Sequence, residues 1–286
     1  MAELPPVGII DTMIDLPFTD VASTYEFLAP NLRDRESTEE FEFPAQYMFK
    51  DVPKAATDDP VAHTLALMDH YGIERGLIGA GSDDQRRALA EHPDRFLPSM
   101  SVDANDGTEA LRQIDKWHSG TGLAALALFP SGCNPAVPIN DKRWYPVYAK
   151  CVELDIPVFI CAGVPGPRVP MAAQKVELLD EVCWFFPELK IVMRHGAEPW
   201  EELAVKLMLK WPNLYYSTSA FAPKYYPKAI VDYANTRGSD KVIYGGYFPM
   251  GLTLERIFDE LPGVGFNDDV WPKFLRHNAE RVLGLG

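Results

Sequence analysis

The chain has little of what marks secreted or membrane-bound proteins. It contains four cysteines in 286 residues, Cys133, Cys151, Cys161 and Cys183, and none of them forms a CxxC pair. Isolated thiols in a chain of this length suit a reducing compartment and need no disulfide framework. No apolar run reaches the roughly 18 residues of a spanning helix, and residues 1–6 lack the features of a signal peptide. These absences predict a cytoplasmic protein without a membrane anchor.

Positive charge is also scarce. Lysine and arginine total 27 against 41 aspartates and glutamates, which gives a formal net charge of −14. Because an acidic surface repels phosphate backbones and anionic lipids, we expect neither a nucleic-acid partner nor a membrane partner. No Gly-x-Gly-x-x-Gly or phosphate-loop pattern follows an expected strand, so no nucleotide cofactor is expected.

The chain does contain a regular alternation of short apolar runs with longer amphipathic ones. Apolar runs of this kind predict parallel strands that are buried on both faces. They occur at 7–13, 75–80, 96–102, 122–129, 157–162, 190–195, 214–218 and 241–245. Helical patterns lie at 60–71, 107–117, 144–154, 175–186 and 200–210. The alternation predicts a single α/β domain over residues 1–286, a (β/α)₈ barrel, with an open doubly wound sheet as the alternative.

Residues 14–59 contain no expected strand or helix and are rich in proline, acidic and aromatic residues. Long loops in compact domains are usually lids or binding loops, or they contain short helices that the pattern hides. On a barrel this segment would overhang the C-terminal mouth, where barrel enzymes keep their active sites. An oligomer contact is the other interpretation, and a homodimer is left open. A second proline- and glycine-rich stretch, 163–170, follows the fifth expected strand at the same end.

Five segments share their order and spacing with one known family. They are 9–11, 67–73, 92–96, 187–196 and 278–285. Through these segments the chain resembles the amidohydrolase-related family, which includes aminocarboxymuconate-semialdehyde decarboxylase. The resemblance implies a TIM barrel that acts on a small-molecule organic acid at the C-terminal ends of its strands.

The same resemblance bears on metal binding. Family members usually hold one divalent metal through a His-x-His pair on the first strand, a histidine after the fifth and an aspartate after the eighth. Those positions fall here on Met13, Asp15, Cys161 and Tyr247, whereas the family's acid/base histidine after the sixth strand remains as His195. A thioether suits zinc or manganese poorly, and a phenol must first lose a proton with a pKa near ~10. We therefore expect no metal cofactor, and a zinc ion on Asp15, Cys161 and His195 is the alternative.

Three residues are expected to be catalytic. His195 titrates near neutrality and suits general acid–base catalysis. Asp15 would act as a base if burial raised its pKa, and Tyr247 would donate a hydrogen bond to an oxyanion. Each also has a structural interpretation, as a satisfied histidine, a loop-capping carboxylate and a packing ring. Asp11, deeper on the first strand, is expected to anchor a neighbouring strand.

Substrate binding is expected from Arg168, Cys161 and Met13. Arg168 lies in the 163–170 stretch and could clamp a carboxylate through two parallel hydrogen bonds. Cys161 is either a reactive thiol or a small core residue. Arg194 should point away from the pocket if His195 points in, because neighbouring residues on a strand face opposite sides.

These residues predict a metal-independent hydrolase or carbon–carbon lyase that acts on a small carboxylate, lactone or thioester. A catalytically silent barrel that binds a ligand or a partner protein is the second hypothesis. A zinc-dependent hydrolase or decarboxylase with substituted ligands is the third.

Overall fold

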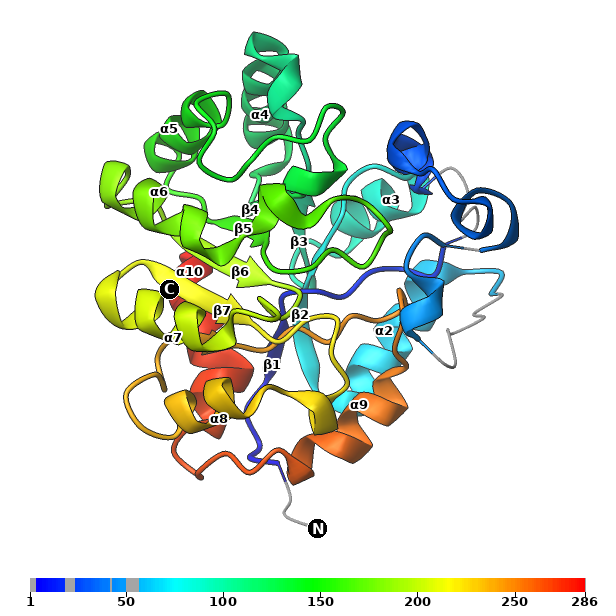
Figure 1. Cartoon of the computed structure of the whole chain (residues 1–286). Helices are drawn as coiled ribbons and strands as arrows, with labels where there is room; N and C mark the ends of the chain where they lie inside the picture. The colour runs from blue at the N-terminus through cyan, green and yellow to red at the C-terminus, as the bar shows by residue number, and fades with distance from the viewer. Residues whose placement is uncertain (1–3, 19–23, 42, 50–56, 286) are drawn as a thin grey trace.

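The computed structural model describes residues 4–18, 24–41, 43–49 and 57–285. Eight parallel strands form one sheet in chain order, and each strand pairs with the next (Figure 1). They are β1 Ile9–Asp11, β2 Ile73–Ile78, β3 Phe96–Met100, β4 Ala125–Leu128, β5 Val158–Cys161, β6 Ile191–Arg194, β7 Leu214–Ser217 and β8 Val242–Ile243. Each overlaps an expected run, although β2 begins and ends two residues earlier than expected.

Hydrogen bonds beyond the regular pairing join β8 to β1. The backbone N–H of Tyr247 donates to the carbonyl of Met13 at 2.7 Å, and that of Asp15 donates to the carbonyl of Phe248 at 2.8 Å. Ile14 and Phe248 form an isolated parallel bridge. The sequential order and this junction confirm the (β/α)₈ barrel. The open doubly wound sheet is wrong, because its strand order would reverse part-way.

The helices surround the strands (Figure 1). They are α2 Pro60–Tyr71, α3 Asp83–Glu91, α4 Thr108–Thr121, α5 Tyr145–Glu153, α6 Leu179–Phe185, α7 Glu201–Lys210, α8 Lys228–Ala234, α9 Leu254–Glu260 and α10 Asn278–Leu283. The pattern missed α3, α8 and α9. At the start of α3, Ser82 and Gln85 form a capping box, which is a signal readable from sequence. Within the described ranges, no helix is both long and apolar enough to cross a membrane.

Apolar side chains fill the barrel interior and locate its two ends. Phe159, Val192 and Ile243 are among the interior residues, and α10 packs against the same cluster. Nη1 of Arg276, just before α10, donates to the carbonyl of Gly8 at 2.7 Å, so α10 closes the end where β1 begins. Because side chains alternate along a strand, the interior residues at the opposite end include Cys161, two beyond Phe159 on β5. The open mouth is therefore the C-terminal end.

Residues 24–41 and 43–49, called here the cap segment, contain short helical turns at the rim of the barrel (blue in Figure 1). They are η1 Glu26–Asn31, η2 Glu36–Glu40 and η3 Gln46–Met48. Turns this short show no helical periodicity, which is why the sequence predicted only a loop. The remaining parts of the expected 14–59 lid, at 19–23, 42 and 50–56, lie outside the described residues.

Candidate active site at the barrel mouth

Arg194, at the end of β6, points into the barrel and lies between two sulfur atoms. Its Nε donates to Sγ of Cys161 at 3.3 Å, and its Nη1 donates to Sδ of Met13 at 3.6 Å. Burial raises the pKa of the Cys161 thiol, although Arg194 opposes this, so the sulfur is a neutral acceptor. The guanidinium is always charged. Among the described residues, the Arg194 guanidinium has no carboxylate paired directly with it.

The expected outward orientation of Arg194 is wrong. Val192 packs inside the barrel, so alternation along β6 turns Arg194 inward as well. The next residue, His195, has a φ of +67°, a left-handed conformation in which strand alternation ends. Positive φ is uncommon outside glycine, and such strain tends to occur at functional sites. The turn lets both neighbours face the mouth.

The imidazole of His195 is held by one hydroxyl and one aromatic ring. Its Nδ1 lies 3.1 Å from Oγ of Ser219, which also accepts from the His195 backbone N–H at 3.2 Å. The ring meets that of Tyr247 edge-on, with centroids 5.3 Å apart and planes at 73°. Burial and the Arg194 charge hold the pKa of His195 well below its usual 6.5. His195 is therefore a neutral, positioned base near pH 7.

Tyr247 also leaves its strand in a left-handed conformation, with a φ of +69°. Its ring stacks on Phe49 of the cap segment, with centroids 5.7 Å apart. Burial raises the pKa of Tyr247 to about 12, and the nearby Arg194 charge partly opposes this. The phenol stays protonated near neutrality and can donate a hydrogen bond or a proton.

Asp15 lies on the α3 side of the mouth. Its two carboxylate oxygens accept from Nε2 of Gln85 at 2.8 and 2.9 Å, and Oδ1 also accepts from the backbone of Leu16 at 2.8 Å. Burial raises its pKa against these hydrogen bonds. Burial raises the pKa of Tyr25 in the cap segment, and electrostatic interactions with Tyr247 and Asp15 raise it further. The sequence analysis identified neither Gln85 nor Tyr25 as part of the mouth.

Asp11 has the anchoring position expected from the sequence. It is fully buried, and its Oδ1 accepts from the backbones of Met13 at 2.9 Å and Gly246 at 2.8 Å, which ties β1 to the segment after β8. Its Oδ2 has no hydrogen-bond partner within the described ranges. Burial therefore raises the pKa of Asp11 to about 6.

Replacing Asp11 by asparagine should stabilise the protein at neutral pH. Because the folded-state pKa of about 6 exceeds the 3.8 of an ordinary aspartate, folding opposes ionisation of Asp11, and stability falls as the pH rises between these values. Asparagine keeps the Oδ1 acceptor and cannot ionise. Asp11→Asn should raise the free energy of unfolding by about 3 kcal/mol above pH 6 and by little below pH 4. Urea unfolding at pH 4 and pH 7.5 checks this, and an equal difference at both would contradict it.

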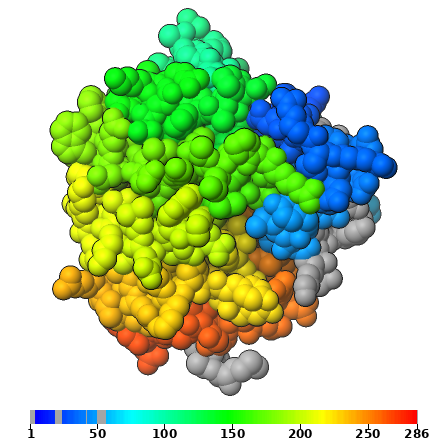
Figure 2. Space-filling view, in the orientation of Figure 1, coloured from blue at the N-terminus to red at the C-terminus, as the bar shows by residue number. Residues whose placement is uncertain are grey.

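Arg168, expected to clamp a substrate carboxylate, binds the cap segment instead. Its Nη1 pairs with Asp34 at 2.7 Å and its Nη2 with Glu36 at 2.8 Å. The guanidinium also lies over the rings of Phe41 and Tyr47, at 5.3 and 4.7 Å from their centroids. In Figure 2 the blue cap segment lies against the green residues after β5. Two carboxylates already neutralise this arginine, so we assign it to holding the cap.

Loss of the contact between Arg168 and the cap segment should open the barrel mouth. Loss of these ion pairs and cation–π contacts should raise the population of an open cap several-fold. Arg168→Ala should therefore raise the alkylation rate of Cys161, which is 4% exposed, by about that factor. Iodoacetamide labelling followed by peptide mass spectrometry measures this. Arg112→Ala, which breaks an exposed ion pair with Glu109, is the matched control. Unchanged labelling in Arg168→Ala would refute the assignment.

Among the described residues, the side chains at the mouth do not form a divalent-metal site. Within the described ranges, no three His, Cys, Asp or Glu side chains gather closely enough to hold one. The alternative zinc set, Asp15, Cys161 and His195, is therefore not assembled. Met13 and Cys161, which stand where the resemblance places metal ligands, both accept from Arg194. A divalent cation there would meet a fixed positive charge.

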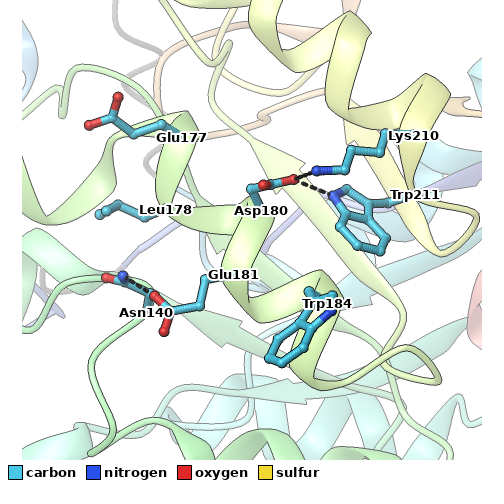
Figure 3. A pocket seen from close by; sticks show the side chains of 8 residues that line it. All are labelled: Asn140, Glu177, Leu178, Asp180, Glu181, Trp184, Lys210 and Trp211. Atoms are coloured by element: carbon cyan, nitrogen blue, oxygen red, sulfur yellow. Dashed lines mark hydrogen bonds and ion pairs between the residues drawn. The ribbon is translucent and has the colours of Figure 1, made fainter.

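A separate hollow of about 430 Å³ lies outside the barrel, beside α6 and the end of α7 (Figure 3). Its polar side chains are already paired, because Asp180 accepts from Lys210 at 2.6 Å and from Trp211 at 2.7 Å. Glu181 accepts from Asn140 at 2.6 Å. The lining contains no histidine or thiol, so we place the candidate active site at the mouth.

Comparison with known proteins agrees with this architecture. A family model described as Amidohydrolase matches residues 18–285. The chain belongs to this amidohydrolase family. The expected resemblance is thereby confirmed.

Two solved structures share the fold. An uncharacterized TIM-barrel protein from Bordetella bronchiseptica is 24% identical, with a TM-score of 0.78 over 97% of this chain and 99% of the other. The 5-carboxyvanillate decarboxylase from Novosphingobium aromaticivorans, complexed with manganese and 4-hydroxy-3-methoxy-5-nitrobenzoic acid, is 15% identical. Its TM-score is 0.67, and the match covers 96% of each chain. At these identities the likeness shows the fold alone.

One curated relative matches over part of the amidohydrolase-family chain. It is a 2-keto-4-carboxy-3-hexenedioate hydratase from Sphingobium, 26% identical over 106 residues. The match covers 32% of this chain and 31% of the hydratase, so it spans about a third of that relative.

Proposed function

We propose that this amidohydrolase-family chain is a lyase that acts on a small organic carboxylate at the barrel mouth without a divalent metal. The observation that carries the proposal is the contact between a neutral imidazole and a protonated phenol, His195 and Tyr247, whose centroids lie 5.3 Å apart. Sites that move protons often hold two titratable groups whose pKa values are pushed apart. The relatives named above include a hydratase and a decarboxylase, which supports a lyase over a hydrolase.

The chain's own residues have complementary tasks in this proposal. His195, oriented by Ser219, takes a proton from water or from the substrate. Tyr247 donates to the oxygen that gains negative charge. Asp15, fixed by Gln85, orients a polar group on the α3 side. The cap segment limits access of bulk water to the mouth.

The test is turnover in the presence of a chelator. Protein purified without added metal is incubated with hydroxybenzoates, followed by release of carbon dioxide, and with unsaturated keto acids, followed by loss of their ultraviolet absorbance. We expect turnover with well under one equivalent of zinc, manganese or iron by elemental analysis. Chelator should leave the melting temperature unchanged, because the positively charged guanidinium of Arg194 lies where a bound metal ion would need its ligands.

Two outcomes would overturn this function. Turnover that requires added manganese or zinc would favour the metal-dependent hypothesis. Ligand binding without turnover of any compound would favour the silent barrel.

A further inference from the structure

The guanidinium of Arg194 has no ion-pair partner among the described residues. It presents five N–H donors, and the contacts found for it are to the two sulfurs, at 3.3 and 3.6 Å. A thiol and a thioether are weak, uncharged acceptors, so they support the guanidinium without neutralising it. A partly buried cation without a counter-ion is unfavourable, and an arriving anion removes that cost.

The geometry of the mouth decides where that anion would lie. Arg194 directly precedes His195 in the chain, and the His195 ring meets that of Tyr247 with centroids 5.3 Å apart, so the three side chains lie together at the mouth. An anion on Arg194 would therefore lie next to the acid–base pair. The aromatic rings of Tyr247 and Phe49, stacked 5.7 Å apart, offer an apolar surface beside it.

Arg168 offers no comparable site. Asp34 and Glu36 lie 2.7 and 2.8 Å from its guanidinium nitrogens, so a substrate carboxylate would have to displace both. Arg194 needs no such displacement. The planar fork of its free N–H groups matches the two oxygens of a carboxylate.

We propose that Arg194 binds the substrate carboxylate and supplies the positive charge that a metal ion would otherwise provide at the mouth. This inference rests on the proposed function for its substrate, a planar organic acid with its carboxylate toward Met13 and Cys161. The side chains of Met13 and Cys161 are uncharged, so they leave Arg194 available to the substrate. A carboxylate side chain at either one would neutralise Arg194 internally and exclude the substrate.

Calorimetric titration with benzoate tests this without any need for turnover. Benzamide has nearly the same shape and no charge, so it isolates the contribution of the anion. With chelator present throughout, wild-type protein should bind benzoate and should bind benzamide at least about 30-fold more weakly. Arg194→Met should lose at least about 30-fold in benzoate affinity. Arg194→Lys should fall between them, because it keeps the charge and loses the fork.

Cys161→Asp provides a second variant if Arg194→Met does not fold. It leaves the arginine in place, and benzoate affinity should fall by a similar factor because the new carboxylate competes for the guanidinium. Arg112→Ala, at an exposed pair with Glu109, should bind as wild type does. Equal benzoate affinity in wild type and Arg194→Met would overturn the proposal, as would equal affinity for benzamide or no benzoate binding by wild type.

The result is separable from the proposed function. Benzoate binding through Arg194 in a protein that turns over nothing would retain this site and reject the lyase. Full turnover by Arg194→Met would reject this site and retain the lyase.

Discussion

The His195→Asn variant is expected to fold normally and to lose a factor of about 10²–10⁴ in kcat, the contribution of a positioned proton-transfer group. Asparagine tolerates the left-handed backbone, with its φ of +67°, better than most residues and can still bond to Ser219. It cannot act as a base near neutrality. KM should change little, because Arg194 remains to bind the carboxylate.

Steady-state kinetics on the substrate found in the chelator assay measure the loss. The matched control is His277→Asn, because His277 is exposed and adjoins α10 at the closed end of the barrel. Parent-like kcat in His195→Asn would refute the assigned role. An equal fall in both variants would point to a general loss of structure.

The Tyr247→Phe variant should lose about 2.7–4 kcal/mol of transition-state stabilisation, or roughly 100–1,000-fold in kcat. Phenylalanine keeps the stacking on Phe49 and the edge contact with His195, so only the hydroxyl is removed. The melting temperature should therefore be nearly unchanged. If the ring merely packs, kcat would remain close to that of the parent and the oxyanion role would be wrong.

Tyr148→Phe is the matched control. Its buried hydroxyl donates to the carbonyl of Ile139 at 2.7 Å, away from the mouth. Loss of that hydrogen bond should lower stability by about 1 kcal/mol and leave kcat unchanged. The two variants thus separate loss of a catalytic hydroxyl from loss of a structural one.

The barrel could be predicted because parallel strands buried on both faces are apolar along their whole length. Such apolar runs can be recognised in the sequence without any knowledge of tertiary contacts. The short turns of the cap segment gave no such signal, since the longest of them, η1 and η2, span only Glu26–Asn31 and Glu36–Glu40. Helix α3 could have been found from the capping box at Ser82 and Gln85. The same capping residue, Gln85, also orients Asp15, a link that no local pattern reveals.

Only part of the candidate site could be expected from the sequence. His195 and Tyr247 meet at the mouth, as their positions at strand ends and the resemblance suggested. The roles of the two arginines could not be assigned from sequence. The partners of Arg168, Asp34 and Glu36, are more than 130 residues distant in the chain, and contacts at that separation depend on the tertiary fold. Alternation along β6 turns Arg194 inward with Val192, and His195 joins it at the mouth only through a left-handed turn that leaves no local signature in a histidine.

A crystal structure of the benzoate complex, grown with chelator, tests the central claim most directly. The account predicts both carboxylate oxygens at about 2.7–2.9 Å from nitrogens of Arg194, with the ring beside His195 and Tyr247. A divalent metal held by Asp15, Cys161 and His195 in protein prepared without chelator, or benzoate bound at Arg168, would contradict it.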